Sequence, residues 1–199
     1  MKSGIIISAL SVVLLSGCQT AVQPHYVATG KLKPLPGASR VAVTASVIDL
    51  RDINPKLIFS YFDNVMYTTA DKQALGDAVR TGVRDGLRQL GFRDTNPPNK
   101  EITVSIAGCK IMNESNHPIY PPIWTGRIKW NVSVSSVRST QHRNIEIADS
   151  WELHSTHPDS LSLSLADANK ISSDFISLAV DATLSNRAVQ SALLRPNPR

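Results

Sequence analysis

The chain has 199 residues, a net charge of +5 and a hydrophobic fraction of 42%. This length suits one globular domain with a single core. A positive balance this mild is compatible with an anionic membrane or sugar surface, but it does not point to any particular ligand.

The amino terminus has the pattern of an export signal. Lys2 precedes a twelve-residue apolar run from Gly4 to Leu15, whereas a helix that spans a bilayer needs about 20 apolar residues. The run is therefore predicted to be the core of a signal peptide, with the small residues Ser16 and Gly17 just before the cleavage point.

The next feature is Leu15-Ser16-Gly17-Cys18, which resembles the lipobox of bacterial lipoproteins. The resemblance implies cleavage between Gly17 and Cys18 and acylation of Cys18 by palmitate-type chains. Three chains would anchor the protein permanently, because two membrane signals already suffice. The alternative is a secreted protein with a chance Cys after its signal. Gln19 stands where Asp marks inner-membrane retention, so the resemblance implies the periplasmic face of the outer membrane, where no nucleic acid partner is expected.

Four segments are predicted. Residues 1–17 are the lipoprotein signal peptide, and their removal leaves 182 of the 199 residues. Residues 18–39 are the lipidated Cys18 and a flexible tether, because prolines and glycines interrupt this stretch without apolar periodicity. Residues 40–195 form a single periplasmic domain, and residues 196–199 are a short tail.

The first half of the domain combines strands with one helix. Residues 41–48 are rich in β-branched side chains and predict a mostly buried strand, and residues 57–68 predict a small hairpin around Asp63-Asn64. Residues 71–90 carry apolar side chains four apart, which predicts a helix that ends at Gly91. Interior glycines cost about 1 kcal/mol each relative to Ala, so Gly82 and Gly86 predict that this helix lies very close to a sheet.

The second half predicts three strands and a helix. Alternating apolar residues over 102–111, 128–134 and 145–153 predict an antiparallel meander, with a bulge at Gly108. Residues 167–194 predict one helix, with a capping box at Ser164 and Asp167. The fold class is therefore α+β: a mixed, largely antiparallel sheet in the order strand, helix, three strands, helix, with two helices packed on one face.

Arg80, Arg84 and Arg88 form a basic ladder on the predicted helix. Such a ladder is a candidate anion-binding site for phosphate or sulfate groups of lipid headgroups. The alternative is a solvated face balanced by Asp77 and Asp85.

The loop over residues 117–126 contains three prolines together with Tyr120, Ile123 and Trp124. Aromatic side chains held by a rigid loop are good interface anchors, so these three residues are candidates for partner binding. The alternative is that they close one end of the core.

Catalytic and metal-binding patterns are lacking in the sequence. There is no nucleophile elbow, phosphate-binding glycine loop or cysteine pair with zinc spacing. His154 and His157 have a spacing that two metal ligands could use, but a polar loop explains them better. Cys109 would be the only cysteine left beside an acylated Cys18, and it is predicted to be a buried thiol without a disulfide. We therefore predict no enzyme activity, no metal and no cofactor.

Several short motifs give a family resemblance. The lipobox, the first strand followed by Asp49-Leu50-Arg51, the helix ending Leu87-Arg-Gln-Leu-Gly-Phe92 and the strand from Ile102 resemble the YajG type of uncharacterised bacterial lipoprotein. The resemblance implies a small α+β domain on the outer membrane, without established catalysis. Asp49 and Arg51 are interpreted as a structural turn.

Three functional hypotheses follow from these patterns. The first is a membrane-anchored, non-catalytic module that binds an unknown envelope protein. The second is an accessory lipoprotein of a lipid or lipopolysaccharide transport machine. The third is an enzyme that acts on cell-wall glycan, which ranks last because no acid, base and nucleophile converge.

Overall fold

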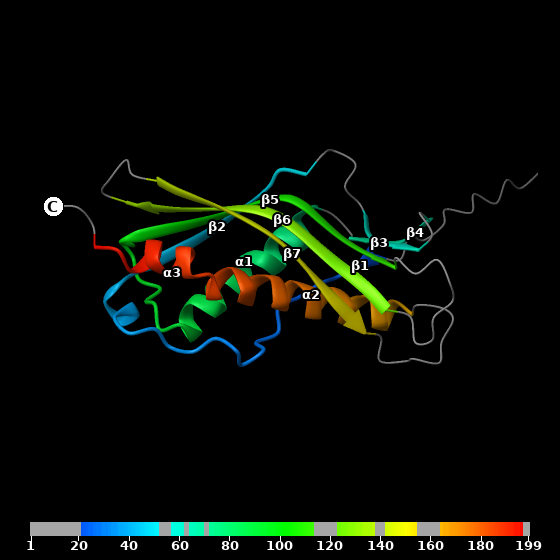
Figure 1. Cartoon of the computed structure of the whole chain (residues 1–199), viewed down its shortest axis with the longest axis horizontal. Helices are drawn as coiled ribbons and strands as arrows, with labels where there is room; N and C mark the ends of the chain where they lie inside the picture. Colours follow the sequence, from blue (N-terminus) through cyan, green and yellow to red (C-terminus); the bar gives the residue numbers. More distant parts are fainter. Residues whose placement is uncertain are drawn as a thin grey trace, which may run out of the picture.

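The computed structural model describes residues 21–51, 57–61, 64–69, 72–113, 123–137, 142–154 and 164–196. In this part of the chain, helices cover one face of a single sheet (Figure 1). The strands are β1 (Ala21–Val22), β2 (Val43–Asp49), β3 (Leu57–Tyr61), β4 (Asn64–Thr69), β5 (Lys100–Asn113), β6 (Ile123–Ser136) and β7 (His142–His154). The helices are α1 (Lys72–Gln89), α2 (Leu165–Ser185), α3 (Arg187–Leu194) and a 3-10 turn over Ala38–Arg40. The α+β class is confirmed.

β5 is the strand around which the sheet is organised. One of its edges pairs antiparallel with β6, and β6 pairs antiparallel with β7, as the predicted meander requires. The other edge pairs in parallel with β2 near Lys100 and with β3 near Ile111. β3 and β4 form the predicted hairpin, and β4 pairs in parallel with β1. The sheet is therefore mixed but largely antiparallel.

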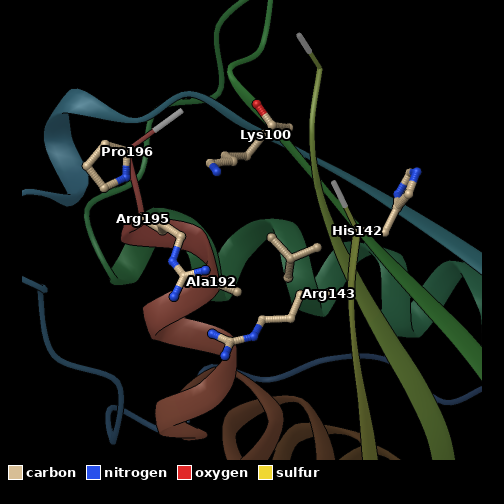
Figure 2. Close-up of a pocket in the computed structure, with 8 residues that line it drawn as sticks. Lys100, His142, Arg143, Ala192, Arg195 and Pro196 are labelled. Carbon is tan, nitrogen blue, oxygen red and sulfur yellow. The ribbon is translucent and has the colours of Figure 1, made fainter. Parts of the chain in front are cut away.

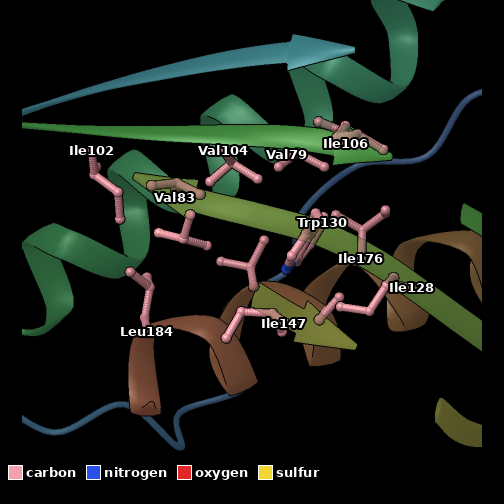
Figure 3. Packing of buried hydrophobic residues seen from close by; sticks show 14 of the residues in the cluster. Val79, Val83, Ile102, Val104, Ile106, Ile128, Trp130, Ile147, Ile176 and Leu184 are labelled. Atoms are coloured by element: carbon pink, nitrogen blue, oxygen red, sulfur yellow. The ribbon is translucent and has the colours of Figure 1, made fainter. Parts of the chain in front are cut away.

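The core lies between the sheet and the helices (Figure 3). Burial alternates along the central part of β6, so Trp130, Val132 and Val134 point to the core while Lys129 and Asn131 face solvent. The register of β5 shifts between Ile106 and Gly108, which confirms the predicted bulge.

α1 forms because its apolar residues recur once per turn. Leu75, Val79, Val83 and Leu87 are all buried against the core. Gly91 has a φ of 90°, and the N–H of Phe92 donates to the carbonyl of Leu87 at 3.0 Å. This is a Schellman ending, in which glycine adopts the left-handed conformation at low cost.

The predicted carboxy-terminal helix is divided in two. Asn186 interrupts it, and its Oδ1 accepts hydrogen bonds from the N–H groups of Ala188 at 2.9 Å and Val189 at 3.4 Å. Asn is a favoured N-cap because its side chain satisfies such free donors. The prediction of one continuous helix was therefore wrong at Asn186. The predicted cap at Ser164 is confirmed, since Ser164 Oγ accepts from the N–H of Asp167 at 3.1 Å.

Residues 21–37 form an extended segment, here called the amino-terminal arm, which runs along α2. The arm's backbone N–H groups donate to side chains of α2. The pairs are Gln23 to Asn169 Oδ1 at 2.8 Å, His25 to Ser173 Oγ at 3.1 Å and Val27 to Ser177 Oγ at 2.9 Å. Two residues of extended chain rise about 6.6 Å, and four residues of helix rise about 6 Å, so alternate arm residues match successive turns.

The arm is also held by its side chains. A Cβ atom on Gly82 would lie 2.8 Å from a ring carbon of Tyr26, and one on Gly86 would collide with Leu184 and Leu32. The predicted close packing of the glycines is confirmed, but their neighbours are the arm and α2 instead of the sheet. The predicted flexible tether is wrong for residues 21–39. Prolines and glycines exclude a helix there, but they do not distinguish a free segment from a packed one.

Candidate functional site

A basic pocket lies where the starts of β5 and β7 meet the end of β6 and the end of α3 (Figure 2). Its cavity has a volume of about 240 Å³. The lining residues are Lys100, Val134, Ser136, His142, Arg143, Ala192, Arg195 and Pro196. Because they come from four distant segments, only the tertiary fold creates this site.

The backbone beside Lys100 is fixed by four hydrogen bonds. The N–H groups of Asn99 and Lys100 donate to the carbonyl of Ala42 at 2.8 and 3.0 Å. Asn99 Oδ1 accepts from the N–H of Ala42 at 2.9 Å, and its carbonyl accepts from the N–H of Val137 at 3.2 Å. Lys100 itself is only 7% exposed. Its ammonium group is thus placed by the junction of β2, β5 and β6.

The two arginines come from other elements. Arg143 lies at the start of β7, where it pairs with Val134 of β6. Arg195 directly follows α3, and its N–H donates to the carbonyl of Ser191 at 3.1 Å. Figure 2 shows both guanidinium groups and the ammonium group of Lys100 on the same side of β7, whereas the imidazole of His142 points away from them.

The charge in this pocket is unbalanced. Its described lining contains three cationic side chains and neither Asp nor Glu. Within the described residues, no ion pair or hydrogen bond engages the side-chain nitrogens of Lys100, Arg143 or Arg195. The carboxy-terminal end of α3 carries about half a negative charge, which offsets only part of this excess.

Burial lowers the pKa of the Lys100 ammonium group, and the positive charge of Arg195 lowers it further. No negatively charged group of the described residues is among the causes of this shift. An anion in the pocket would stabilise the charged form of Lys100. The arrangement can therefore attract and orient an anion, with guanidinium forks and an ammonium group as donors.

The structure does not bring the predicted arginine ladder to this pocket. Arg80, Arg84 and Arg88 are exposed on α1 and engaged with carboxylates. The ion pairs are Arg80–Asp77 at 2.6 Å, Arg84–Asp94 at 3.3 Å, Arg88–Asp85 at 3.0 Å and Arg88–Asp94 at 2.8 Å. Anion binding by the ladder stays a prediction, and a ligand would have to compete with these carboxylates.

Of the three predicted partner-binding residues, the structure describes Ile123 and Trp124. Trp124 is 2% exposed and lies in β6 opposite Leu153 of β7, which agrees with the alternative that this side chain belongs to the core. Alternation along a strand turns this side chain toward the core, which a proline-rich loop pattern does not reveal. Ile123 is the half-buried first residue of β6, and Tyr120 lies outside the described residues.

Asp49 and Arg51 form a buried ion pair after β2. Arg51 Nη2 lies 2.6 Å from Asp49 Oδ2, and Arg51 Nε donates to Asp49 Oδ1 at 2.9 Å. The N–H of Arg51 also donates to Asp49 Oδ1, at 3.1 Å, which supports the predicted structural turn. Cys109 lies nearby and is half-buried; burial raises the pKa of its thiol to about 12. A thiol of that pKa is a poor nucleophile at neutral pH.

Other predicted features cannot be placed. Gly17, Cys18 and His157 lie outside the described residues. Within the described ranges, no group of His, Cys, Asp and Glu could hold a metal ion, and no helix is long and apolar enough to cross a membrane. No sequence pattern pointed to Lys100, Arg143 and Arg195 as a site. No local pattern could have found them, because 43 or more positions separate neighbours in this set.

Comparisons with known proteins show the fold. No protein-family model and no curated protein matches this chain. Protein XCC0632 from Xanthomonas campestris, assigned to DUF330, has a TM-score of 0.52 at 9% identity, over 86% of this chain and 94% of that one. A candidate lipoprotein from Caulobacter crescentus reaches a TM-score of 0.44 at 12% identity, over 72% of this chain and 95% of that one. A candidate homologue of neuraminyllactose-binding hemagglutinin from Helicobacter pylori reaches 0.40 at 9% identity, over 85% and 97%. The chain thus shares its α+β fold with XCC0632.

Proposed function

We propose that this chain is a bacterial lipoprotein, acylated on Cys18 and held on the periplasmic face of the outer membrane. The lipobox Leu15-Ser16-Gly17-Cys18 after a short apolar run supports this proposal. Gln19 after the Cys supports outer-membrane sorting. The proposed mode of attachment is acyl chains on Cys18, without a spanning segment.

The arm changes how the anchor would hold the domain. Ala21 belongs to β1, which pairs with Thr68 of β4. Ala21 is three positions after Cys18, and three residue steps of extended chain span at most about 10 Å. The anchor would therefore keep the domain close to the lipid surface, with β1 and β4 toward the membrane.

We further propose that the domain binds a partner or ligand and does not catalyse a reaction. The observation that carries this proposal is the basic pocket, where Lys100, Arg143 and Arg195 gather without a carboxylate in the described lining. Cations alone can hold an anion, whereas hydrolysis also needs a positioned base or nucleophile. The His142 imidazole points away from the cations (Figure 2).

Metabolic labelling with palmitate tests the anchor. The wild-type chain should incorporate label and fractionate with outer membranes, and Cys18→Ala should do neither. Cys109→Ala is the matched control, because its thiol lies in the folded domain and labelling should persist. Gln19→Asp should move the labelled protein to the inner membrane. Equal labelling of the wild type and Cys18→Ala would contradict the proposal.

A second candidate is an accessory role in lipid or lipopolysaccharide transport. The basic pocket favours it, because those lipids carry phosphate groups that cationic side chains recognise. In-cell photocrosslinking from Asn144, which is exposed on β7 beside Arg143, should then capture a transporter subunit. A crosslinker at Arg80 on α1 is the control. The same products from both positions would contradict a specific partner at the pocket.

A further inference from the structure

We propose that the basic pocket at the end of α3 is a binding site for a phosphoryl group. The inference deepens the proposed binding function, since it names the class of ligand. It rests on the described geometry of the pocket, and only the side from which the ligand arrives depends on acylation of Cys18.

Lys100 is a buried cation in the wall of this pocket. A charged side chain that is 7% exposed normally has a partner of opposite charge, because burial of an unpaired charge is costly. Lys100 has none among the described residues, and the other charged side chains of the described lining are cations. A bound anion would supply the missing partner.

The choice of a phosphoryl group follows from charge and shape. A carboxylate offers two oxygens and one negative charge, whereas a phosphate monoester offers three terminal oxygens and carries about two charges near neutral pH. Donors that come from β5, β7 and α3 can each meet a different oxygen of a tetrahedral group. Guanidinium groups also bind phosphate with paired hydrogen bonds. Phosphate therefore balances these three cations better than a carboxylate does.

The volume limits how much of the ligand the pocket holds. A cavity of about 240 Å³ is smaller than the roughly 300–1,000 Å³ of sites that enclose a whole drug-sized molecule. The pocket thus suits a terminal phosphoryl group, while the rest of the ligand remains outside. The apolar side chains of Val134 and Ala192 form part of its wall.

The position of the pocket identifies the side from which the ligand arrives. The pocket is at the Lys100 end of β5, and β3 pairs with Ile111 near the other end. Eleven residues of strand separate those positions by about 36 Å. β1, which follows the proposed anchor, lies with β3 and β4 away from α3 (Figure 1). A headgroup in the anchoring leaflet would not reach the pocket, so the phosphoryl group comes from the periplasm or from a lipid presented there.

Titration of the full chain with inorganic phosphate tests the site. The chain is purified in non-ionic detergent, and binding is measured by calorimetry against a chloride control of equal ionic strength. Lys100→Met and Arg195→Gln should each weaken binding by about tenfold or more, as expected for loss of a charge-assisted hydrogen bond. Lys170→Gln on α2, an exposed cation outside the pocket and outside the arginine ladder, is the matched control and should bind as the wild type does.

The variants of Arg195 serve as the control for loss of folding. Lys100 is buried, so Lys100→Met could alter the junction of β2 and β5, whereas Arg195 is exposed after α3. Each variant is compared with the wild type by urea denaturation. Phosphate binding that persists unchanged in a folded Arg195→Gln/Arg143→Gln double variant would overturn the proposal.

A second experiment distinguishes binding of free phosphate from binding of a phosphate group carried by a lipid. The chain is placed in phosphatidylcholine nanodiscs, and separate vesicles of phosphatidylcholine with or without phosphatidylglycerol are added. Binding of inorganic phosphate without vesicle capture supports a soluble phosphorylated ligand. Capture only of phosphatidylglycerol vesicles, lost in Arg195→Gln but not in Lys170→Gln, supports a lipid phosphate. Neither phosphate binding nor vesicle capture would overturn the site while leaving acylation of Cys18 unaffected.

Discussion

Gly82 lies so close to Tyr26 that a Cβ atom on Gly82 would be 2.8 Å from Tyr26 Cδ2. α1 therefore has a glycine where the amino-terminal arm crosses it. This contact explains why a helix interior tolerates a residue of low helix propensity. It also makes the arm, which directly follows the proposed anchor, a part of the folded domain.

Gly82→Ala should destabilise the protein even though Ala favours helices. Overpacking against Tyr26 costs about 1–3 kcal/mol, which equals or exceeds the gain in helix propensity of about 1 kcal/mol. Gly76→Ala on the same helix is the control, because no atom of the described residues, apart from its chain neighbours and the backbone of its own helix, lies within 4 Å of its Cβ position. Gly76→Ala should stabilise by up to about 1 kcal/mol. Urea denaturation measures both variants, and equal stabilisation by the two would contradict packing of the arm on Gly82.

Tyr26 should make stability depend on pH in the alkaline range. Its hydroxyl donates to Asp181 Oδ1 at 3.1 Å and accepts from Gln89 Nε2 at 3.1 Å. Burial raises the pKa of Tyr26 from 10.0 to about 12. In the unfolded chain the phenol ionises near its usual pKa of about 10. The stability that neutral Tyr26 contributes is therefore complete below about pH 10 and is lost as pH rises to about 12.

Tyr26→Phe isolates this effect. The free energy of unfolding of the wild type should fall more steeply than that of Tyr26→Phe between about pH 9 and pH 11. Thr29→Val is the control, since Thr29 also donates to Asp181 but does not titrate. That variant should lose similar stability at both pH values and keep the wild-type slope. If the free energy of unfolding of Tyr26→Phe falls with pH as steeply as that of the wild type, ionisation of Tyr26 does not cause the pH dependence.

Arg51→Met should be strongly destabilising. The side chains of Arg51 and Asp49 are 5% and 10% exposed, and loss of one partner of such a buried pair costs about 3–5 kcal/mol. The exposed pair Lys170–Asp174 on α2 is the comparison, for which Lys170→Met should cost less than about 1 kcal/mol. The double variant Arg51→Met/Asp49→Asn should recover part of the loss. Urea midpoints provide the measurement, and equal costs for Arg51→Met and Lys170→Met would contradict the buried pair.

Local pattern was sufficient for most elements of the fold. The apolar period of four identified α1 and its ending at Gly91, because the face that a helix buries is encoded within a few turns. Alternation identified the β5–β6–β7 meander, and the parity break identified the bulge at Gly108. Asn186 shows where such patterns fail: the apolar period continues across it while its side chain caps a new helix.

The sequence by itself determined most of the secondary structure, the α+β class and the lipobox on which the proposed anchor rests. Only the tertiary structure decided that residues 21–37 pack on α2, that Trp124 is buried and that Lys100, Arg143 and Arg195 share a pocket. The physical reason is the range of the interactions. Periodicity records which side of one element is buried, whereas contacts between residues far apart in the chain depend on how the elements pack.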